Sequence, residues 1–327
     1  MSASGGTNDE RVSVVIPTFD RPAYLQIALE SALAQTYRNL EIIVCDNGSR
    51  TDPAPLVAAC GDPRVRLHRH PRNIGQTANM VAGIAMTKGK YVAILGDDDV
   101  WRPDFIATLI APMQADPTVI VSFCDHDIID AQGRIDAEVT ERVTRRFGRH
   151  LLRQGLYRSF DEIALVYRSI CVVSGSLIRR DAIDWSRIPK DLPISIDIYI
   201  AYLLATADGS CAYIPNRLMQ YRYHSLARAN AFTNVQRSWR ADLRCSLELW
   251  MTFFRDERVK CQSYVKMVCV RKAVLIVLDR LQRRDWRGVG AEIGQFLRLG
   301  LLDPRAIFYH FLYFQRFQRQ GMRRWLP

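Results

Sequence analysis

Three consecutive aspartates, Asp97, Asp98 and Asp99, follow a short hydrophobic run that ends at Gly96. An unperturbed carboxyl group has a pKa of roughly 4, so all three side chains would be ionised at neutral pH. Placing three negative charges side by side costs free energy unless a cation or strong hydrogen-bond donors neutralise them. Hard carboxylate oxygens at a strand end suit Mg²⁺ or Mn²⁺, and these ions in turn suit a diphosphate-bearing substrate.

The elements that must position these acids follow an alternating pattern in the first half of the chain. Short β-branched runs alternate with helical patterns, which predicts βαβ units and a largely parallel sheet flanked by helices, an α/β fold. The expected strands are Val12–Ile16, Leu40–Cys45, Val65–His68, Tyr91–Leu95 and Val119–Phe123. The expected helices are Pro22–Gln35, Pro53–Ala59, Gly75–Thr87 and Pro103–Gln114. Ligands bind at the carboxyl ends of such strands, so loops 17–20, 46–49 and 96–99 should open on one edge.

The second half begins with a less regular pattern. Residues 125–160 are charged and predict loops, residues 171–178 predict a strand, and 197–207 and 211–214 predict a helix and a strand. Beyond these the pattern is helical, with long helices expected over 232–256, 259–283, 286–299 and 304–320. We therefore expect a flexible stretch at 1–11, an α/β domain at 12–228 and a basic helical region at 229–327.

Charge is unevenly distributed along the 327 residues, whose formal net charge is +11. Residues 217–327 carry 22 Lys and Arg against 8 Asp and Glu, whereas residues 1–216 carry 23 against 26. This asymmetry indicates either an anionic surface nearby or a merely solvated basic face. Eight scattered cysteines without CxxC spacing indicate buried thiols in a reducing compartment. With no signal-peptide or membrane-spanning pattern, we expect a cytoplasmic protein.

Several motifs occur in a fixed order over residues 12–105. They are Val14-Val15-Ile16-Pro17-Thr18-Phe19-Asp20-Arg21-Pro22, Glu41-Ile42-Ile43-Val44-Cys45-Asp46-Asn47-Gly48-Ser49, Asn73-Ile74-Gly75 and Gly89-Lys90-Tyr91-Val92-Ala93-Ile94-Leu95-Gly96-Asp97-Asp98-Asp99. Each motif alone is weak, but in this order the chain resembles the bacterial family-2 glycosyltransferases. The resemblance implies the GT-A fold, a nucleotide-diphospho-sugar donor and Mg²⁺ or Mn²⁺ as cofactor.

By this resemblance the first two motifs would hold the nucleoside. Pro17, Thr18 and Phe19 would lie against it, and Asp46 would bind the base. Alone, Asp46 could equally satisfy backbone donors in an Asx-type turn. Asp20 stands where the family more often has asparagine, and it could be a helix N-cap.

The third and fourth motifs would complete the donor site. Asn73 and Gly75 would face the nucleotide or its phosphates, although a plain helix cap is an alternative. In the fourth motif the resemblance implies that Asp99 is the metal ligand. Asp97 would be either a second metal ligand or a residue that lies near the ribose. The separate role of Asp98 in donor binding stays open, because Gly96 replaces the first acid of the longer family pattern. An acidic turn that only caps the next helix is the alternative.

The remaining candidates lie later in the chain. Inverting transfer needs a base to take the proton of the acceptor hydroxyl, and Asp197 resembles the family's base although Ile196 replaces the usual acid before it. A helix-start aspartate is the alternative, and Asp191 is a second candidate. Arg222 and His224 resemble a segment that would neutralise the diphosphate and add a metal ligand.

The segment 304–325 combines an aromatic face with arginines, which suits an interfacial helix at the inner face of an anionic membrane. Packing onto the chain or onto a second copy is equally compatible, whereas nucleic acid is disfavoured because no nucleic-acid motif is present.

The sequence thus predicts a metal-dependent, inverting glycosyltransferase of hexosyl or deoxyhexosyl type. The acceptor would be a glycan, a lipid-linked glycan or a small molecule in surface polysaccharide or glycoconjugate synthesis. A sugar-phosphate nucleotidyltransferase and a catalytically degenerate nucleotide-sugar-binding module are the alternatives.

Overall fold

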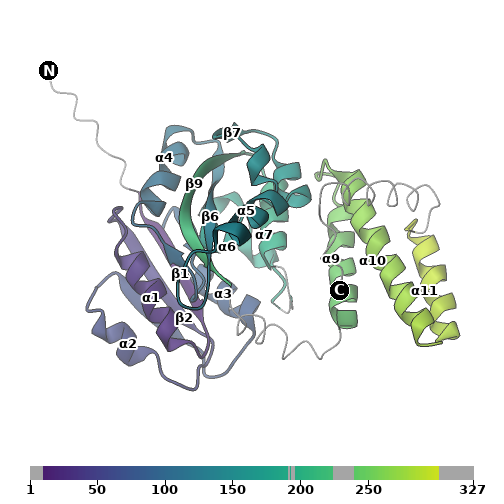
Figure 1. The fold of residues 1–327 in the computed structure, drawn as a ribbon, viewed down its shortest axis with the longest axis horizontal. Coiled ribbons are helices and arrows are strands. Elements are labelled where there is room, and N and C mark those ends of the chain that lie inside the picture. The colour runs from purple at the N-terminus through teal and green to yellow at the C-terminus, as the bar shows by residue number, and fades with distance from the viewer. Residues whose placement is uncertain (1–9, 191, 193–195, 224–238, 302–327) are drawn as a thin grey trace. The chain divides into compact units, whose positions relative to one another are not determined.

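The computed structural model describes residues 10–190, 192, 196–223 and 239–301. The chain divides into two compact units, Met1–Ala229 and Asn230–Pro327. The first unit contains the sheet and all the described candidate residues of the site (Figure 1).

A nine-stranded sheet forms the centre of the first unit, with the strand order β3-β2-β1-β4-β8-β6-β9-β5 and with β7 paired to β9. Strands β1, β2, β3 and β4 are mutually parallel, β8 is antiparallel to both of its neighbours, and β6 runs parallel to β9. The sheet is therefore mixed and largely parallel, as expected. The strands are β1 (Val12–Thr18), β2 (Leu40–Asp46), β3 (Val65–Arg69), β4 (Tyr91–Ile94), β5 (Val100–Trp101), β6 (Val119–Ile129), β7 (Gly155–Tyr157), β8 (Ser176–Arg179) and β9 (Ser210–Arg222).

Helices cover both faces of this sheet, which is why its inner strands are almost continuously apolar. Helices α1 and α4 share one core with alternate residues of β1, including Val14 and Ile16. On the opposite face α3 approaches so closely that a Cβ atom on Gly83 would lie 2.6 Å from Val15 Cγ1. The α-helices of this unit are α1 (Pro22–Leu33), α2 (Ala54–Ala59), α3 (Gln76–Ala85), α4 (Phe105–Ala115), α5 (Ala137–Arg146), α6 (Val172–Gly175) and α7 (Ile196–Ala205). Short 3-10 helices lie at Arg149–Leu151, Arg180–Ala182 and Trp185–Arg187, and a short π-helix lies at Glu162–Val166.

The prediction of loops over 125–160 is wrong. Strand β6 continues to Ile129, and α5 follows it with the Asp136 carboxylate capping its N-terminus. The polar half of β6 is buried because Asp125 accepts a 2.7 Å hydrogen bond from Arg149, which lies 24 residues later in the chain. Sequence patterns cannot show such a distant partner.

Two further boundaries differ from the sequence prediction. The expected strand at 171–178 begins only at Ser176, because Ser174 adopts φ 66° in the turn of α6. The expected strand at 211–214 extends through Pro215 to Arg222, pairing with β6 along its length across register shifts. This longer β9 carries Tyr221 and Arg222 to the aspartate loop.

The second unit consists, in its described part, of α9 (Trp239–Arg255), α10 (Gln262–Gln282) and α11 (Trp286–Arg298). The helices expected over 232–256, 259–283 and 286–299 overlap these three, while the one expected over 304–320 lies outside the described residues. Within the described chain, no helix combines the length and the apolar character that a bilayer span requires.

Candidate active site

The three aspartates lie in the turn between β4 and β5, where protein donors surround them. Asp97 accepts a 2.8 Å hydrogen bond from Thr18 Oγ1 at the end of β1. Asp99 accepts hydrogen bonds from Ser174 Oγ at 2.6 Å and from the Arg222 backbone N–H at 2.9 Å. The loop thus joins residues from β1, the α6 turn and β9.

Burial makes Asp97 and Asp99 reluctant to ionise. The pKa of Asp97 is raised to about 6 by burial and by the charge of Asp98, although Arg21, Thr18 and the Phe19 N–H act in the opposite direction. Burial and Asp98 also raise the pKa of Asp99, to about 8, against the effect of its hydrogen-bond donors. The loop therefore favours the approach of positive charge.

One positive charge already lies there. Arg21, in the first-strand loop just before α1, donates from Nη1 to Asp98 Oδ2 at 2.7 Å and to Asp97 Oδ1 at 3.2 Å. Arg21 was not among the residues predicted for the site. Its position at the carboxyl end of the first strand, on the edge where the aspartates were expected, is the sequence feature that could have indicated it.

The donor set fits a hard divalent cation. A Cβ atom placed on Gly96 would lie 2.9 Å from Asp99 Oδ2 and 3.3 Å from Asp98 Oδ1, so two carboxylate oxygens converge on the space beside this glycine. Among the described residues no three His, Cys, Asp or Glu side chains gather in a metal-binding group. Magnesium-type sites commonly use one or two carboxylates, with water and substrate phosphate as the other ligands. His224, the third predicted ligand, lies outside the described residues.

Asp46, predicted to bind the base, is fully buried at the end of β2. Its carboxylate accepts hydrogen bonds from the N–H and the hydroxyl of Ser49 and, at 3.1 Å, from Arg69 Nε. These contacts match the Asx-type turn that the sequence left open. Binding of the base by Asp46 stays a prediction.

The loops that carry Asp46 and Asn73 are joined to each other. Asn47 Nδ2 donates to Asn73 Oδ1 at 3.1 Å, and Asn47 Oδ1 accepts from the Ile74 N–H at 2.9 Å. Gly48 adopts φ +74°, and a Cβ atom there would lie 2.5 Å from the Arg72 carbonyl carbon. Only glycine permits this approach. Asn73 also accepts from the Gly75 N–H at 2.9 Å, so its amide fixes the entrance to α3.

Asp20 is not the N-cap of α1. The cap position is Arg21, which makes no side-chain capping bond, and Pro22 begins the helix. The Asp20 carboxylate instead accepts from Arg50 N at 2.7 Å and Arg50 Nε at 2.9 Å. Next to it, Phe19 is 36% exposed at the rim of the loop, while Pro17 lies within β1 beside Cys45.

Asp197, the predicted base, occupies the first turn of α7. The residue is exposed to solvent, yet many protein atoms surround its carboxyl group. This crowding raises the pKa of Asp197, while Arg168 and a hydrogen bond from the Val173 N–H lower it. Asp191, the second candidate, lies outside the described residues.

One turn contacts both acids. In α6 the Val173 N–H faces Asp197, and the adjacent Ser174 hydroxyl donates to Asp99. The same hydroxyl accepts a 2.8 Å hydrogen bond from the Gly96 N–H, so the turn is attached to the aspartate loop at two points. The predicted metal ligand and the predicted base are thus held by neighbouring residues.

Arg222, predicted to neutralise the diphosphate, has a buried side chain with backbone partners. Its Nε donates to the Asp98 carbonyl at 2.8 Å and its Nη1 to the Asp130 carbonyl at 2.9 Å. The guanidinium also lies 5.0 Å from the ring centroid of Tyr24. These contacts fix the backbone of the aspartate loop, and a contact with diphosphate stays a prediction.

Tyr221 is a neighbour of the site that sequence reasoning did not select. Burial raises the pKa of its phenol, and the charges of Asp99 and Asp197 raise it further, so the hydroxyl lies within the electrostatic range of both acids. The residue remains 40% exposed. A neutral phenol at this position can donate a hydrogen bond to a ligand between the acids.

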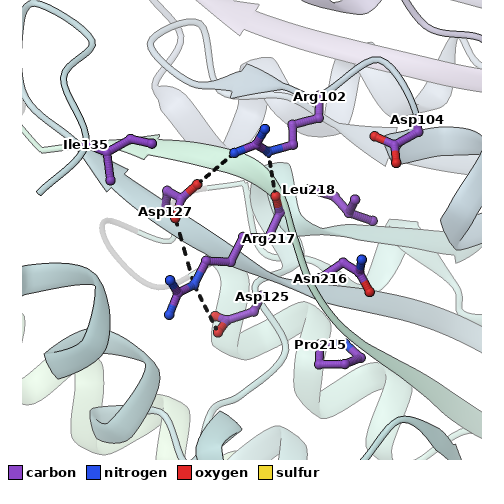
Figure 2. Close-up of a pocket in the computed structure, with 9 residues that line it drawn as sticks. All are labelled: Arg102, Asp104, Asp125, Asp127, Ile135, Pro215, Asn216, Arg217 and Leu218. Carbon is purple, nitrogen blue, oxygen red and sulfur yellow. Dashed lines mark hydrogen bonds and ion pairs between the residues drawn. The ribbon is translucent and has the colours of Figure 1, made fainter. Parts of the chain in front are cut away.

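A separate groove of about 700 Å³ is lined by residues of β6 and β9 and of the segments next to β5 and α5 (Figure 2). Its charged groups pair with one another: Arg102 contacts Asp127 at 3.2 Å, and Arg217 lies 3.8 Å from the same carboxylate and 3.9 Å from Asp125. None of the three consecutive aspartates lines it. The lining residues are Arg102, Asp104, Asp125, Asp127, Ile135, Pro215, Asn216, Arg217 and Leu218.

Comparison with known proteins identifies the family. The sequence profile of Glycosyl transferase family 2 matches residues 13–183, about half of the chain. The chain belongs to glycosyl transferase family 2. Its similarity to one member extends further: succinoglycan biosynthesis protein ExoO of Rhizobium meliloti is 35% identical over 304 residues, covering 90% of this chain and 82% of ExoO.

Other relatives match a shorter part of the chain. An uncharacterized glycosyltransferase of Rickettsia prowazekii is 35% identical over 120 residues, which cover 36% of this chain and only 37% of that protein. The Escherichia coli glucosyltransferase WfaP is 31% identical over 107 residues, covering 33% of this chain and 43% of WfaP. The chain therefore matches well under half the length of these two relatives.

Solved structures confirm the fold that the family resemblance implied. Residues 1–349 of Staphylococcus aureus TarS, in complex with UDP-GlcNAc, superpose with a TM-score of 0.64 at 10% identity, covering 90% of this chain and 82% of that fragment. The mannosyltransferase PcManGT of Pyrobaculum calidifontis, in complex with GDP-Man and Mn²⁺, gives 0.57 at 16% identity, covering 93% and 84%. The chain has the GT-A glycosyltransferase fold.

Proposed function

We propose that this chain is a metal-dependent, inverting glycosyltransferase that moves a sugar from a nucleotide-diphospho-sugar to a hydroxyl of a glycan or lipid-linked acceptor. The relation to ExoO over most of both chains favours an acceptor in the synthesis of a surface polysaccharide. The neighbours solved with UDP-GlcNAc and GDP-Man favour a nucleotide-sugar donor.

The donor would bind at the edge of the sheet where β1, β2 and β4 end. Pro17 to Phe19 and the joined loops of Asn47 and Asn73 would enclose the nucleoside, and Asp46 would hold the base. Asp98 and Asp99 would hold a divalent cation, with Asp97 held by Thr18 beside them. When bound, the cation would offset the negative charge of the diphosphate as it departs.

Asp197 would activate the acceptor. Its carboxylate would take the proton of the acceptor hydroxyl, whose oxygen attacks the anomeric carbon from the side opposite the diphosphate. The bond to the nucleotide breaks as the new glycosidic bond forms, which inverts the configuration. A raised pKa, caused here by burial, makes a carboxylate a better proton acceptor near neutral pH.

The observation that carries this proposal is the α6 turn, where Val173 and Ser174 contact Asp197 and Asp99 respectively. A base and a cation-binding acid held by adjacent residues fit a single displacement between two substrates. A nucleotidyltransferase needs no base for an acceptor hydroxyl at this position. A degenerate binding module needs no reactive acid there.

Donor turnover with and without EDTA tests the metal requirement, and full activity in the strict absence of divalent ions would exclude it. For the base, we expect Asp197→Asn to lower kcat by at least about 100-fold while donor binding stays unchanged. Asp208→Asn, at an exposed residue in the turn that follows α7, is the matched control and should keep normal turnover. Tight donor binding without turnover in the unmodified chain would favour the binding module instead.

We also propose that residues 12–228 form the transferase domain, with the basic helical region 229–327 placing it near its acceptor. The aromatic and arginine-rich segment 304–325 lies outside the described residues, and its contact with an anionic membrane on the cytoplasmic side is a proposal. Sedimentation with phosphatidylglycerol vesicles, compared with phosphatidylcholine vesicles, tests it. Equal binding to both would exclude an electrostatic membrane contact.

A further inference from the structure

We propose that Arg21 binds the carboxylate of Asp98 beside the cation position in the nucleotide-free enzyme and makes tight metal binding depend on a nucleoside diphosphate. The inference rests on the proposed function, because it requires that a divalent ion and a nucleotide share this site. It assigns to Arg21 a positioning role, since the guanidinium would act through the aspartates.

The geometry places one nitrogen between two acids. Arg21 Nη1 lies 2.7 Å from Asp98 Oδ2 and 3.2 Å from Asp97 Oδ1, and the three side chains are 21%, 17% and 8% exposed. The other oxygen of Asp98 faces the space beside Gly96, where Asp99 Oδ2 also lies. Arg21 and a cation beside Gly96 would therefore share the carboxylate of Asp98.

The backbone holds Arg21 in this position. Asp20 adopts φ 54° and is attached to Ser49 and Arg50, so the chain is fixed just before the arginine. Pro22 begins α1, and its ring disfavours helical backbone angles at the residue before it, where Arg21 adopts φ −135° and ψ 54°. The side chain is therefore directed by a rigid loop rather than by the aspartates alone.

A guanidinium bound to Asp98 weakens the attraction between the loop and a dication. Two unit charges a few ångströms apart near a protein surface interact strongly enough to change an affinity by about tenfold. We therefore expect Arg21 to weaken the binding of a cation alone by roughly tenfold.

A nucleoside diphosphate changes this balance. Its phosphate oxygens accept hydrogen bonds from a guanidinium in a forked geometry, so the arginine can exchange Asp98 for the diphosphate. The carboxylate is then available to the cation. Metal and nucleotide would thus strengthen the binding of each other, and by linkage both effects have the same size.

Manganese binding measured by electron paramagnetic resonance tests the inference, with Mn²⁺ alone and with Mn²⁺ plus UDP, GDP or dTDP. In the unmodified chain we expect weak binding of Mn²⁺ alone and about tenfold tighter binding with the matching nucleotide. In Arg21→Met we expect Mn²⁺ alone to bind roughly tenfold tighter, with most of the nucleotide effect lost. Arg21→Lys keeps the charge and should behave like the unmodified chain.

Arg50→Met is the matched control, because it removes an exposed guanidinium from the neighbouring ion pair with Asp20 and should leave both affinities unchanged. Arg21→Gln replaces Arg21→Met if circular dichroism shows that the methionine variant is unfolded. If neutral variants bind Mn²⁺ no more tightly than the unmodified chain, while that chain still couples metal to nucleotide, the role of Arg21 is wrong and the proposed function stands. If the unmodified chain binds Mn²⁺ neither alone nor in the presence of any of the three nucleotides, both fail.

Discussion

Replacing Asp99 with asparagine should make the metal-free protein less sensitive to pH. The pKa of Asp99 is raised by burial and by Asp98 to about 8 in the folded chain, from 3.8 as the ordinary value. Between these values the folded state binds more protons than the unfolded state, so stability falls as pH rises from about 4 to about 8. Asparagine does not titrate and removes this dependence.

The size of the effect follows from linkage. One titrating group changes the free energy of unfolding by at most about 1.4 kcal/mol per pH unit. Asp97, whose pKa is about 6, titrates in the same range and reduces this dependence, so we expect roughly 2 kcal/mol between pH 5 and pH 7. For a unit of this size that corresponds to roughly 4–8 °C in Tm.

Thermal unfolding of both proteins in EDTA at pH 5, 6 and 7 measures this difference. The difference in Tm between Asp99→Asn and the unmodified chain should increase by roughly 4–8 °C from pH 5 to pH 7, whatever that difference is at pH 5. Glu138→Gln, which removes a fully exposed acid from α5, should follow the unmodified chain. A difference that stays constant with pH would refute a strongly raised pKa at Asp99.

Three further predictions concern the surroundings of the site. Glu41→Gln should lower the free energy of unfolding at pH 7 by about 1.5–3 kcal/mol, as measured by thermal or urea unfolding. The reason is that hydrogen bonds from Ser13 and two backbone N–H groups stabilise the Glu41 carboxylate and lower its pKa against the effect of burial. That stability should be lost as pH falls below 4.5, and an unchanged midpoint at pH 7 would contradict it. Gly48→Ala should weaken donor binding at least about tenfold in calorimetry, because its Cβ atom would meet backbone at 2.5 Å, whereas Gly61→Ala, which meets nothing within 4 Å, should not. Ser174→Ala should lower kcat by about tenfold or more, because Asp99 loses the hydroxyl that donates to it at 2.6 Å, while circular dichroism should show that the variant is folded. Normal turnover would show that this hydrogen bond is not needed for catalysis.

The sheet was largely predictable because its inner strands are buried on both faces. Val12–Thr18 and Leu40–Asp46 read as continuous apolar runs, and helical patterns separate them. The same local signals placed the loops after β1, β2 and β4 on one edge. Parallel pairing of these strands in the structure agrees with that arrangement.

Where polar residues are buried by distant partners, the prediction was wrong. Asp125 and Asp127 made the end of β6 look like a loop, but Arg149 and Arg102 neutralise them. Arg21 was missed for a related reason. An arginine before proline at a helix start looks like surface, and only the strand order brings it to the aspartates.

The turn Val172–Gly175 also fixes a length. In the proposed mechanism Val173 contacts the base Asp197 and Ser174 contacts the cation-binding Asp99, so two neighbouring residues set the separation between the acceptor side and the donor side. A sugar ring must fit within that span. Lengthening or shortening the turn by one residue would alter the span without touching either acid, so this is where an engineer could begin to change which sugars the enzyme accommodates.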